Sequence, residues 1–373
     1  MSNQREEEIL RRRERIKKSK ERRRRNQSRK TGEKKSRRKL IAAGVSIALI
    51  TAAGGAGYTV VMGNAQKKAE VWSYEKEHYG ENVLLSEGLA ATNLCVSADD
   101  KNEISYDGST DVHAAGLFDV DGASVRYSNR IHDRLYPAST TKILTALIAL
   151  ERGNLSDVVT VGKNADVSSF PVDASLCGLH EGDQLTLETL LYGLLLSSGN
   201  DAATAIAEYI SGSEEAFVEE MNDRAKELMA VNTHFMNPHG LHDENHYTTA
   251  YDLYLIFNAC LKDERFVEII SLNPYTATVT GADGTTRTET WTPTHFYGSG
   301  DAQAPEGIRV IGGKTGTTSK AGNCVILYDE DADGTPYISV IMGAEDKTIL
   351  YKEMNQLFTA GILAAVPSAE ADG

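Results

Sequence analysis

The chain of 373 residues is poor in cysteine, tryptophan and proline, with 4, 2 and 8 copies respectively. No two cysteines form the Cys-x-x-Cys spacing that is typical of a structural zinc site or a redox dithiol. Cys260 and Cys324 lie in apolar runs and are interpreted as buried side chains. Because no internal repeat and no proline-rich linker divides the chain, most of it is expected to form one large two-lobed domain.

Acidic residues are scarce in residues 1–39, which contain 19 Lys and Arg but only 6 Asp and Glu. The rest of the chain contains 20 basic and 47 acidic residues, so the formal net charge of −14 hides two opposite parts. A basic arm is compatible with nucleic-acid binding, but a block of like charges is also typical of a solvated, disordered tail. The next segment favours a cytoplasmic tail that sets membrane orientation, so no nucleic-acid partner is expected.

Leu40–Gly63 contains no charged residue. As a helix, its roughly 24 residues reach about 36 Å, which exceeds a ~30 Å hydrocarbon core. Basic residues flank its N-terminal side, so residues 1–39 are expected in the cytoplasm and the acidic remainder outside. The prediction is a single-pass protein of the cell membrane with an extracytoplasmic domain. A cleaved signal peptide ending near Gly63-Asn64-Ala65 is the alternative, which the length of the basic leader disfavours.

Residues 64–105 are charged and weakly periodic, which predicts a stalk or linker. Residues 106–366 are expected to form the main folded domain, and residues 367–373 a C-terminal tail. Strand patterns occur at Ala115–Val120, Ala123–Tyr127, Ile308–Thr315, Asn323–Tyr328 and Tyr337–Gly343. Between the first two and the last three lie a polar hairpin at Tyr275–Thr290 and helical patterns that begin at Ser139, Leu187, Asn200, Ser213 and Tyr251. A last helix covers Lys347–Ala364, so the order predicts an α+β fold with an inserted all-helical lobe.

Three short motifs follow one another in this region: Ser139-Thr140-Thr141-Lys142, Ser198-Gly199-Asn200 and Lys314-Thr315-Gly316. Each pattern also occurs elsewhere. Ser36-Arg37-Arg38-Lys39 and Lys30-Thr31-Gly32 lie in the basic tail, Ser73-Tyr74-Glu75-Lys76 in the stalk, and Ser271-Leu272-Asn273 in a polar connector before Pro274. Order and local setting favour the first set.

The spacing of the first motif has a chemical meaning. Residues three apart on a helix share a face, so Lys142 can reach the Ser139 hydroxyl. A serine is a weak nucleophile until a base takes its proton, and a desolvated lysine can be that base. The alternative is an ordinary helix cap at Ser139 and a solvated Lys142.

The other two motifs also allow two interpretations each. Ser198 can relay a proton and Asn200 can orient an amide, or both can belong to ordinary helix capping. At the third motif, Gly316 lets a peptide approach the strand while Lys314 and Thr315 hold a carboxylate. The alternative there is an edge strand with a protective lysine.

With all three motifs in this order, the chain resembles the low-molecular-mass penicillin-binding proteins, specifically the D-alanyl-D-alanine carboxypeptidases. The resemblance extends to Gly182–Thr186, Leu195–Ala202, Asn237–Leu241 and Ala321-Gly322. It implies a β-lactamase-like fold, with a five-stranded antiparallel sheet flanked by helices.

The resemblance also implies roles for the motif residues. Ser139 would be the acylated nucleophile and Lys142 its base, with Ser198 and Asn200 as the second catalytic element. Lys314, Thr315, Gly316 and Thr317 would bind substrate, and the backbone N–H groups of Ser139 and Thr317 would form the oxyanion hole. The implied partners are the D-Ala-D-Ala end of the peptidoglycan stem pentapeptide and β-lactam antibiotics, with no cofactor and no metal.

The chain departs from that family's pattern at two places. Thr292-Pro293-Thr294-His295 stands where relatives often have Asn-Thr-Asn, and Gly343-Ala344 leads to Lys347 rather than to an Arg. A β-lactamase or D,D-endopeptidase is the alternative enzyme. A class A β-lactamase needs Glu-x-x-x-Asn, and Glu268–Asn273 is one residue too long. The alternative to an enzyme is a non-catalytic scaffold protein that binds the cell wall.

Two other groups of residues could be taken for reactive sites. His234, His239, His242 and His246 form a His-rich stretch, but Pro238 and Gly240 break any helix there, so convergent metal ligands are not expected. Cys177 has no His or Lys beside it in sequence to lower its pKa and is predicted not to be catalytic.

Overall fold

The structure is a computed structural model that describes residues 94–96, 106 and 112–365. The predicted tail 1–39, the predicted transmembrane segment 40–63, most of the predicted stalk and residues 367–373 lie outside the described residues. Within the described ranges, no helix combines the length and the apolar character that a membrane span requires.

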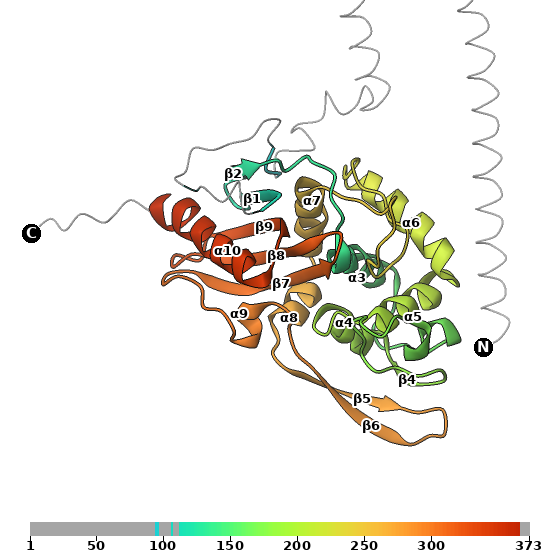
Figure 1. Cartoon of the computed structure of the whole chain (residues 1–373). Helices are drawn as coiled ribbons and strands as arrows, with labels where there is room; N and C mark the ends of the chain where they lie inside the picture. The colour runs from blue at the N-terminus through green and yellow to red at the C-terminus, as the bar shows by residue number, and fades with distance from the viewer. Residues whose placement is uncertain (1–93, 97–105, 107–111, 366–373) are drawn as a thin grey trace, which may run out of the picture. The chain divides into compact units, whose positions relative to one another are not determined.

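A five-stranded antiparallel sheet forms one lobe, as predicted (Figure 1). Its order is β2 (Ser124–Asn129), β1 (Ala114–Asp119), β9 (Pro336–Ala344), β8 (Gly322–Glu330) and β7 (Arg309–Thr318). The first two strands of the chain thus join the last three, because β1 pairs with β9 along its whole length. The strand that carries the third motif, β7, lies at the edge of the sheet.

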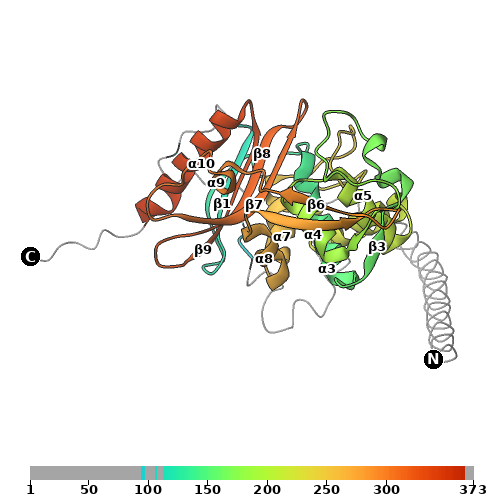
Figure 2. The ribbon, with the colours of Figure 1, turned by 90° about the horizontal axis from the view of Figure 1, so that it is seen from below.

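Helices cover both faces of this sheet (Figure 2). On one face, α10 (Lys347–Gly361) buries Leu350 and Leu357 in a core that includes Leu117 and Leu327 from the strands. On the other face lies the helical lobe, whose core includes Phe118 and other residues from the opposite side of the same strands. Successive strand residues point to opposite faces, so each strand contributes to both cores.

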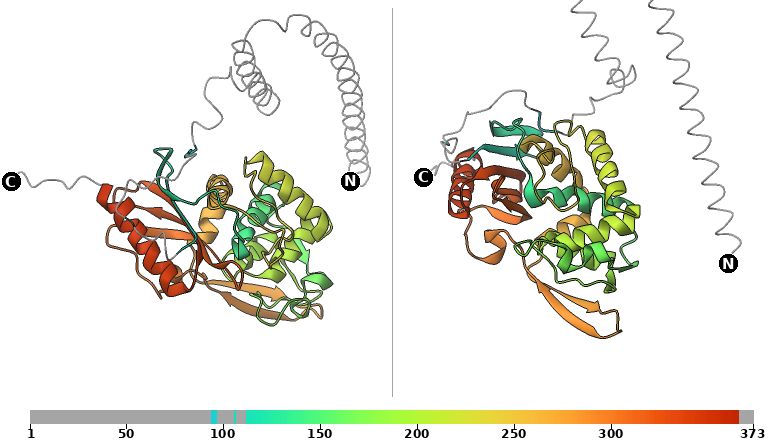
Figure 3. Two further views of the ribbon diagram at one scale, coloured as in Figure 1. Left: turned by 45° about the horizontal axis from the view of Figure 1, so that its top comes forward. Right: turned by 45° about the vertical axis from the view of Figure 1, so that its right-hand side comes forward.

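The inserted lobe is mainly helical, and its helices gather beside the sheet (Figure 3). It is not all-helical as predicted, because two short strands, described below, also belong to it. The helices are α3 (Lys142–Arg152), α4 (Leu187–Leu195), α5 (Asn200–Ser211), α6 (Glu214–Glu227), α7 (Ala250–Cys260) and α8 (Glu264–Ser271). Side-chain oxygens cap four of them, since Thr186, Ser213, Thr249 and Asp263 each accept a first-turn N–H. Ser213, where one of the predicted helical patterns begins, is thus the N-cap of α6.

The structure corrects several expected elements. Ser271 ends helix α8 and does not lie in a polar connector, because Phe266, Ile269 and Ile270 give this short helix a buried face. The predicted hairpin is present as β5 (Tyr275–Thr280) and β6 (Thr286–Trp291). It belongs to an unpredicted four-stranded sheet with β3 (Val158–Thr160) and β4 (Gln184–Thr186). A one-turn helix, α9 (Phe296–Ser299), follows that hairpin.

The compact part of the chain extends beyond the predicted boundary at residue 106. Cys95 is fully buried in the core of the helical lobe. Its backbone N–H donates to Tyr254 Oη over 2.8 Å, and its carbonyl accepts from Tyr251 Oη over 2.9 Å. The described end of the predicted stalk therefore packs onto α7.

Candidate active site

The nucleophile motif begins in a 3₁₀ turn, Ala138–Thr141, and not in an α-helix. The α-helix starts only at Lys142, so the predicted start at Ser139 is wrong by one turn. Two hydroxyl groups tighten this turn, because Thr140 Oγ1 donates to Pro137 O and Thr141 Oγ1 to Ala138 O, both over 2.8 Å. Such side-chain bonds to nearby carbonyls compete with the regular helix pattern.

Lys142 is completely buried, which excludes the solvated surface lysine. Its Nζ lies 2.9 Å from Ser139 Oγ, 2.7 Å from Asn200 Oδ1 and 2.6 Å from the carbonyl oxygen of His239. The first and second motifs thus meet at one nitrogen atom. Burial, together with the nearby charge of Lys314, holds the pKa of Lys142 well below its ordinary value.

The second motif lies in a sharp bend between α4 and α5. Ser198 has a φ of +60°, which is uncommon for a residue other than glycine and marks a backbone held by its surroundings. The Asn200 N–H donates to Ser175 O over 2.9 Å, so α5 begins against the loop that contains Cys177. The side chains of Ser198 and Asn200 are both buried. Neither of them is a helix cap, because α5 begins at Asn200 without a side-chain cap.

A buried carboxylate that the sequence interpretation did not single out supports this bend. Asp201 accepts the backbone N–H groups of Cys177, Gly178 and Leu179 at 2.8–3.1 Å, and that of Ala202 at 2.8 Å. It therefore ties the loop before β4 to the start of α5. Its position directly after the second motif is visible in the sequence, but its partners in the loop are 22 to 24 residues away.

Cys177 fills the space behind the second motif. A Cβ atom at Gly199 would lie 2.2 Å from Cys177 Sγ, and one at Gly193 would lie 2.5 Å from it. Burial, with the charge of Asp201, raises the pKa of this thiol well above its usual value. A thiol in this state is a poor nucleophile, which supports the prediction that Cys177 is not catalytic. Cys260 and Cys324 are buried, as interpreted from the sequence, and both are free thiols.

The third motif brings its lysine into the interior. Lys314 is 1 % exposed and its Nζ donates to Ser198 Oγ and to Thr315 O, both over 2.9 Å, which excludes a protective edge lysine. Burial lowers the pKa of Lys314 to about 7. Gly316 lies against the nucleophile turn, since a Cβ there would be 2.7 Å from Pro137 O and 2.9 Å from the Ser139 nitrogen. Only glycine leaves room for this approach.

The remaining part of the third motif lies at the edge of the site. Thr315 Oγ1 is 2.6 Å from Thr294 Oγ1, so the segment that departs from the family pattern contacts the motif directly. Thr317 is exposed, and its Oγ1 donates to Asn323 Oδ1 over 3.0 Å. Lys347, in the second departing segment, lies over the ring of Phe296, with Nζ 5.2 Å from its centre.

The four histidines of the His-rich stretch make four different sets of contacts. His234 Nδ1 lies 2.8 Å from Asn245 O, and the His242 ring packs edge-on against Tyr136. His239 Nε2 is 3.6 Å from Glu214 Oε1, and His246 Nε2 is 2.8 Å from Thr141 Oγ1. Over the part of the chain that the structure describes, no group of His, Cys, Asp and Glu side chains is arranged to hold a metal ion.

The other copies of the motifs contribute no residue to this site, as far as they lie within the described residues. Ser36, Ser73 and Lys30 lie outside the described residues. Glu268 is exposed on α8 and pairs with Arg265 over 3.0 Å, and the Asn273 amide donates to Gly298 O.

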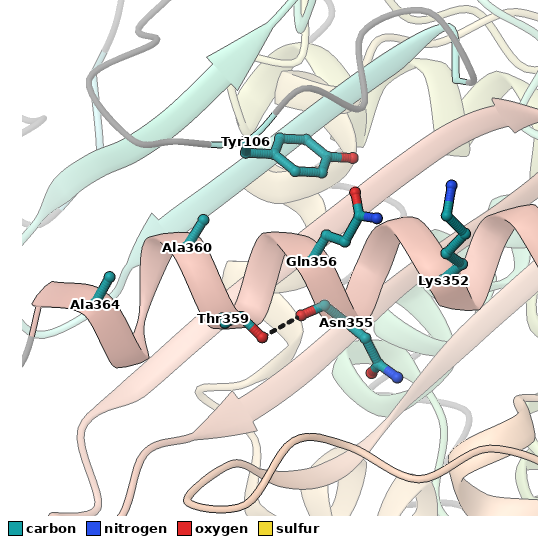
Figure 4. Close-up of a pocket in the computed structure, with 7 residues that line it drawn as sticks. All are labelled: Tyr106, Lys352, Asn355, Gln356, Thr359, Ala360 and Ala364. Carbon is teal, nitrogen blue, oxygen red and sulfur yellow. Dashed lines mark hydrogen bonds between the residues drawn. The ribbon is translucent and has the colours of Figure 1, made fainter.

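An open depression of about 770 Å³ lies elsewhere, beside α10 (Figure 4). The ring of Tyr106 overlies the helix there, and Lys352, Gln356 and Ala360 contribute to the lining. None of the motif residues lines it.

The sequence of the chain matches a family of known proteins. The profile of the D-alanyl-D-alanine carboxypeptidase family matches residues 100–346. The chain is 42% identical over 156 residues to the D-alanyl-D-alanine carboxypeptidase DacF of Bacillus subtilis, a match that covers 40% of this chain and 39% of the relative. It is 32% identical over 262 residues to the D-alanyl-D-alanine carboxypeptidase DacC of Escherichia coli, with 68% and 62% covered. The chain thus matches less than two thirds of the length of these two relatives.

Solved structures show the same fold. The Streptomyces K15 DD-transpeptidase superposes with a TM-score of 0.61 at 28% identity, over 67% of this chain and 96% of that one. Penicillin-binding protein 5 from Haemophilus influenzae superposes with a TM-score of 0.59 at 29% identity, over 70% and 72%. The fold is therefore that of the penicillin-binding proteins, and the chain belongs to the D-alanyl-D-alanine carboxypeptidase family.

Proposed function

We propose that the protein is a serine-type D-alanyl-D-alanine carboxypeptidase that removes the terminal D-Ala of peptidoglycan stem peptides through an acyl-enzyme on Ser139. The observation that carries the proposal is the contact of 2.9 Å between the buried Lys142 Nζ and Ser139 Oγ. Membership of the family supports the substrate class, because the relatives named above are D-alanyl-D-alanine carboxypeptidases.

The surroundings of Lys142 support its role as the general base. A neutral amine has two N–H donors and one lone pair. Asn200 Oδ1 and His239 O can only accept, so they occupy the two donors. The lone pair is then left for the third neighbour, the hydroxyl of Ser139. The lowered pKa of Lys142 favours the neutral form that this arrangement requires.

The proposed reaction has two steps, acylation of Ser139 and hydrolysis of the acyl-enzyme. Ser139 Oγ bonds to the carbonyl carbon of the penultimate D-Ala while its proton moves to Lys142. The C–N bond breaks, and the leaving amine takes the proton that Lys142 received, with the Ser198 hydroxyl as the proposed relay. Water hydrolyses the ester in the second step, and Ser139 regains its proton. We assign the carboxylate of the substrate to Lys314, Thr315 and Thr317, beside Gly316, and the oxyanion to the N–H groups of Ser139 and Thr317.

The same site is proposed to react with β-lactam antibiotics. Slow release of the antibiotic is expected, because the nearest candidate for positioning a hydrolytic water, Glu268, is exposed and paired with Arg265. This disfavours the β-lactamase alternative. The buried Lys142 and Lys314 disfavour a non-catalytic scaffold, which has no need for two desolvated amines.

The proposal is tested by release of D-Ala from a synthetic stem pentapeptide, measured by chromatography. The wild-type protein should release one D-Ala per peptide, and Ser139→Ala none. An endopeptidase would instead cleave a cross-linked dimer and leave the pentapeptide intact.

We also propose the membrane topology for the full chain, with residues 1–39 in the cytoplasm, 40–63 across the membrane, 64–105 as a linker and the catalytic domain outside. The support is the charge asymmetry around an uncharged segment. Protease treatment of intact cells should remove the domain and spare the tail. A protected domain together with a digested tail would indicate the opposite orientation.

A further inference from the structure

The residue before the nucleophile has a strained backbone. Ala138 has a φ of +48°, a conformation that costs an L-residue free energy unless its surroundings hold it. Ala138 is 3 % exposed, and its carbonyl lies so close to Gly240 that a Cβ there would be 1.9 Å from the oxygen. The conformation of this residue fixes the direction in which the chain enters Ser139.

A chain of three hydrogen bonds ends on the carbonyl of Ala138. The Met236 N–H donates to His246 Nδ1 over 3.2 Å. His246 Nε2 lies 2.8 Å from Thr141 Oγ1, and Thr141 Oγ1 donates to Ala138 O over 2.8 Å. An amide N–H can only donate and a carbonyl can only accept, so the protons of the chain have one possible direction. His246 must therefore carry its proton on Nε2 and donate it to Thr141.

The surroundings of the His246 ring favour this direction of the hydrogen bonds. It is 2 % exposed, and Phe235 packs edge-on against it with ring centres 5.5 Å apart. Burial lowers the pKa of His246 to about 3, so the ring stays neutral at neutral pH. A neutral ring has one donor and one acceptor, which is what the two neighbours need.

The segment that His246 holds also contacts the general base. His239 O accepts from Lys142 Nζ over 2.6 Å, and Pro238 O accepts from Thr145 Oγ1 over 2.6 Å. Residues 236–240 thus contact the nucleophile turn and the first turn of α3 at separate points. A shift of this segment would move Ser139 and Lys142 relative to each other.

We propose that His246 and Thr141 are positioning residues, which hold Ala138, and through it Ser139, in the reactive geometry by a one-way hydrogen-bond chain from Met236. Neither residue takes part in proton transfer. The consequence for acylation rests on the proposed function, but the hydrogen-bond chain itself does not. A purely structural role would lower stability and leave the reactivity of the folded protein unchanged.

Matched pairs of substitutions distinguish a positioning role from a purely structural one. Thr141→Ser keeps the hydroxyl, and Thr141→Val keeps the shape without it. His246→Gln places an amide nitrogen near the position of Nε2, whereas His246→Asn reaches only the position of Nδ1. Each variant is assayed for its rate of acylation by benzylpenicillin, for the Kd of the complex that precedes acylation, and for its melting temperature.

The acylation rate constant should fall about tenfold or more in Thr141→Val and His246→Asn, with the Kd unchanged. Thr141→Ser and His246→Gln should recover most of the rate. The double variant Thr141→Val/His246→Asn should be no slower than Thr141→Val alone, because both changes break one chain. Wild-type acylation rates in folded Thr141→Val, or additive losses in the double variant, would overturn the proposal.

Nitrogen-15 NMR of the histidine rings gives a readout that does not depend on activity. The wild-type protein should show His246 as the Nε2–H form at neutral pH. If the wild-type protein is not acylated at all, the proposed function fails, while the tautomer still tests the hydrogen-bond chain. A His246 ring protonated on Nδ1, or a doubly protonated one, would contradict the inference.

Discussion

Lys314 Nζ donates a hydrogen bond to Ser198 Oγ over 2.9 Å, which joins two motifs that are 116 residues apart in the chain. Lys314 belongs to the edge strand of the sheet, and Ser198 to the bend between two helices of the other lobe. The site is therefore built where the two lobes meet. Lys142 completes the junction through its contact with Asn200.

We expect acylation to require Lys142 as a neutral amine and not as a positive charge. Lys142→Ala should abolish acylation by penicillin and release of D-Ala. Lys142→Arg should do the same, because a guanidinium keeps the charge but cannot take up a proton. In the wild-type protein the acylation rate should rise with pH through the lowered pKa of Lys142. Substantial acylation of Lys142→Arg would show that the charge suffices.

The charge of Lys314 should control the binding of substrates that end in a carboxylate. Since burial lowers its pKa to about 7, the amine is charged below that pH and neutral above it. The kcat/KM for such a substrate should therefore fall as the pH rises above about 7. A substrate with an amide in place of the carboxylate should show no such fall. Lys314→Ala should weaken turnover while some acylation remains. An alkaline limb that is the same for both substrates would rule out Lys314 as its origin.

Asp201 should be important for stability because its two oxygens accept four backbone N–H groups. In Asp201→Asn one of these oxygens becomes an amide nitrogen that faces donors. The free energy of unfolding should fall by roughly 1–3 kcal/mol, measured by denaturant titration. Asp173→Asn, at an exposed position in the same loop, is the control and should be neutral. Equal stability of the two variants would refute this role.

Asp329 should lower stability at neutral pH. It is fully buried, and burial raises its pKa well above the usual value, which the nearby Ser339 only partly offsets. A carboxyl group with a raised pKa in the folded state contributes stability at low pH, and this contribution is lost as the pH rises toward the raised value. Asp329→Asn should therefore increase the free energy of unfolding at neutral pH by roughly 1–3 kcal/mol, and by less in acid. Exposed Asp333→Asn is the control. A gain that is independent of pH would contradict this explanation.

The sequence patterns indicate the strands of the main sheet and most helices, and the family resemblance implies that the strands form one five-stranded antiparallel sheet. The sequence could not predict β3 and β4, which are three residues each and too short to show a pattern. It also missed α8, where only Phe266, Ile269 and Ile270 mark a buried face.

The motif residues could be chosen from the sequence by their order, but their supporting partners could not. His246, Asp201 and the carbonyl of His239 act through contacts with residues distant in the chain. Backbone carbonyls leave no trace in residue identity, and a φ of +48° at an alanine has no sequence signal. The supporting groups therefore follow only from the fold.

We propose Ser139 as the acylated nucleophile, and a peptide map of penicillin-labelled protein locates the acylated residue. The protein is incubated with benzylpenicillin, digested and analysed by mass spectrometry. We expect one adduct, on the peptide that contains Ser139, and no adduct in Ser139→Ala. A label on any other residue, or full release of D-Ala by Ser139→Ala, would contradict it.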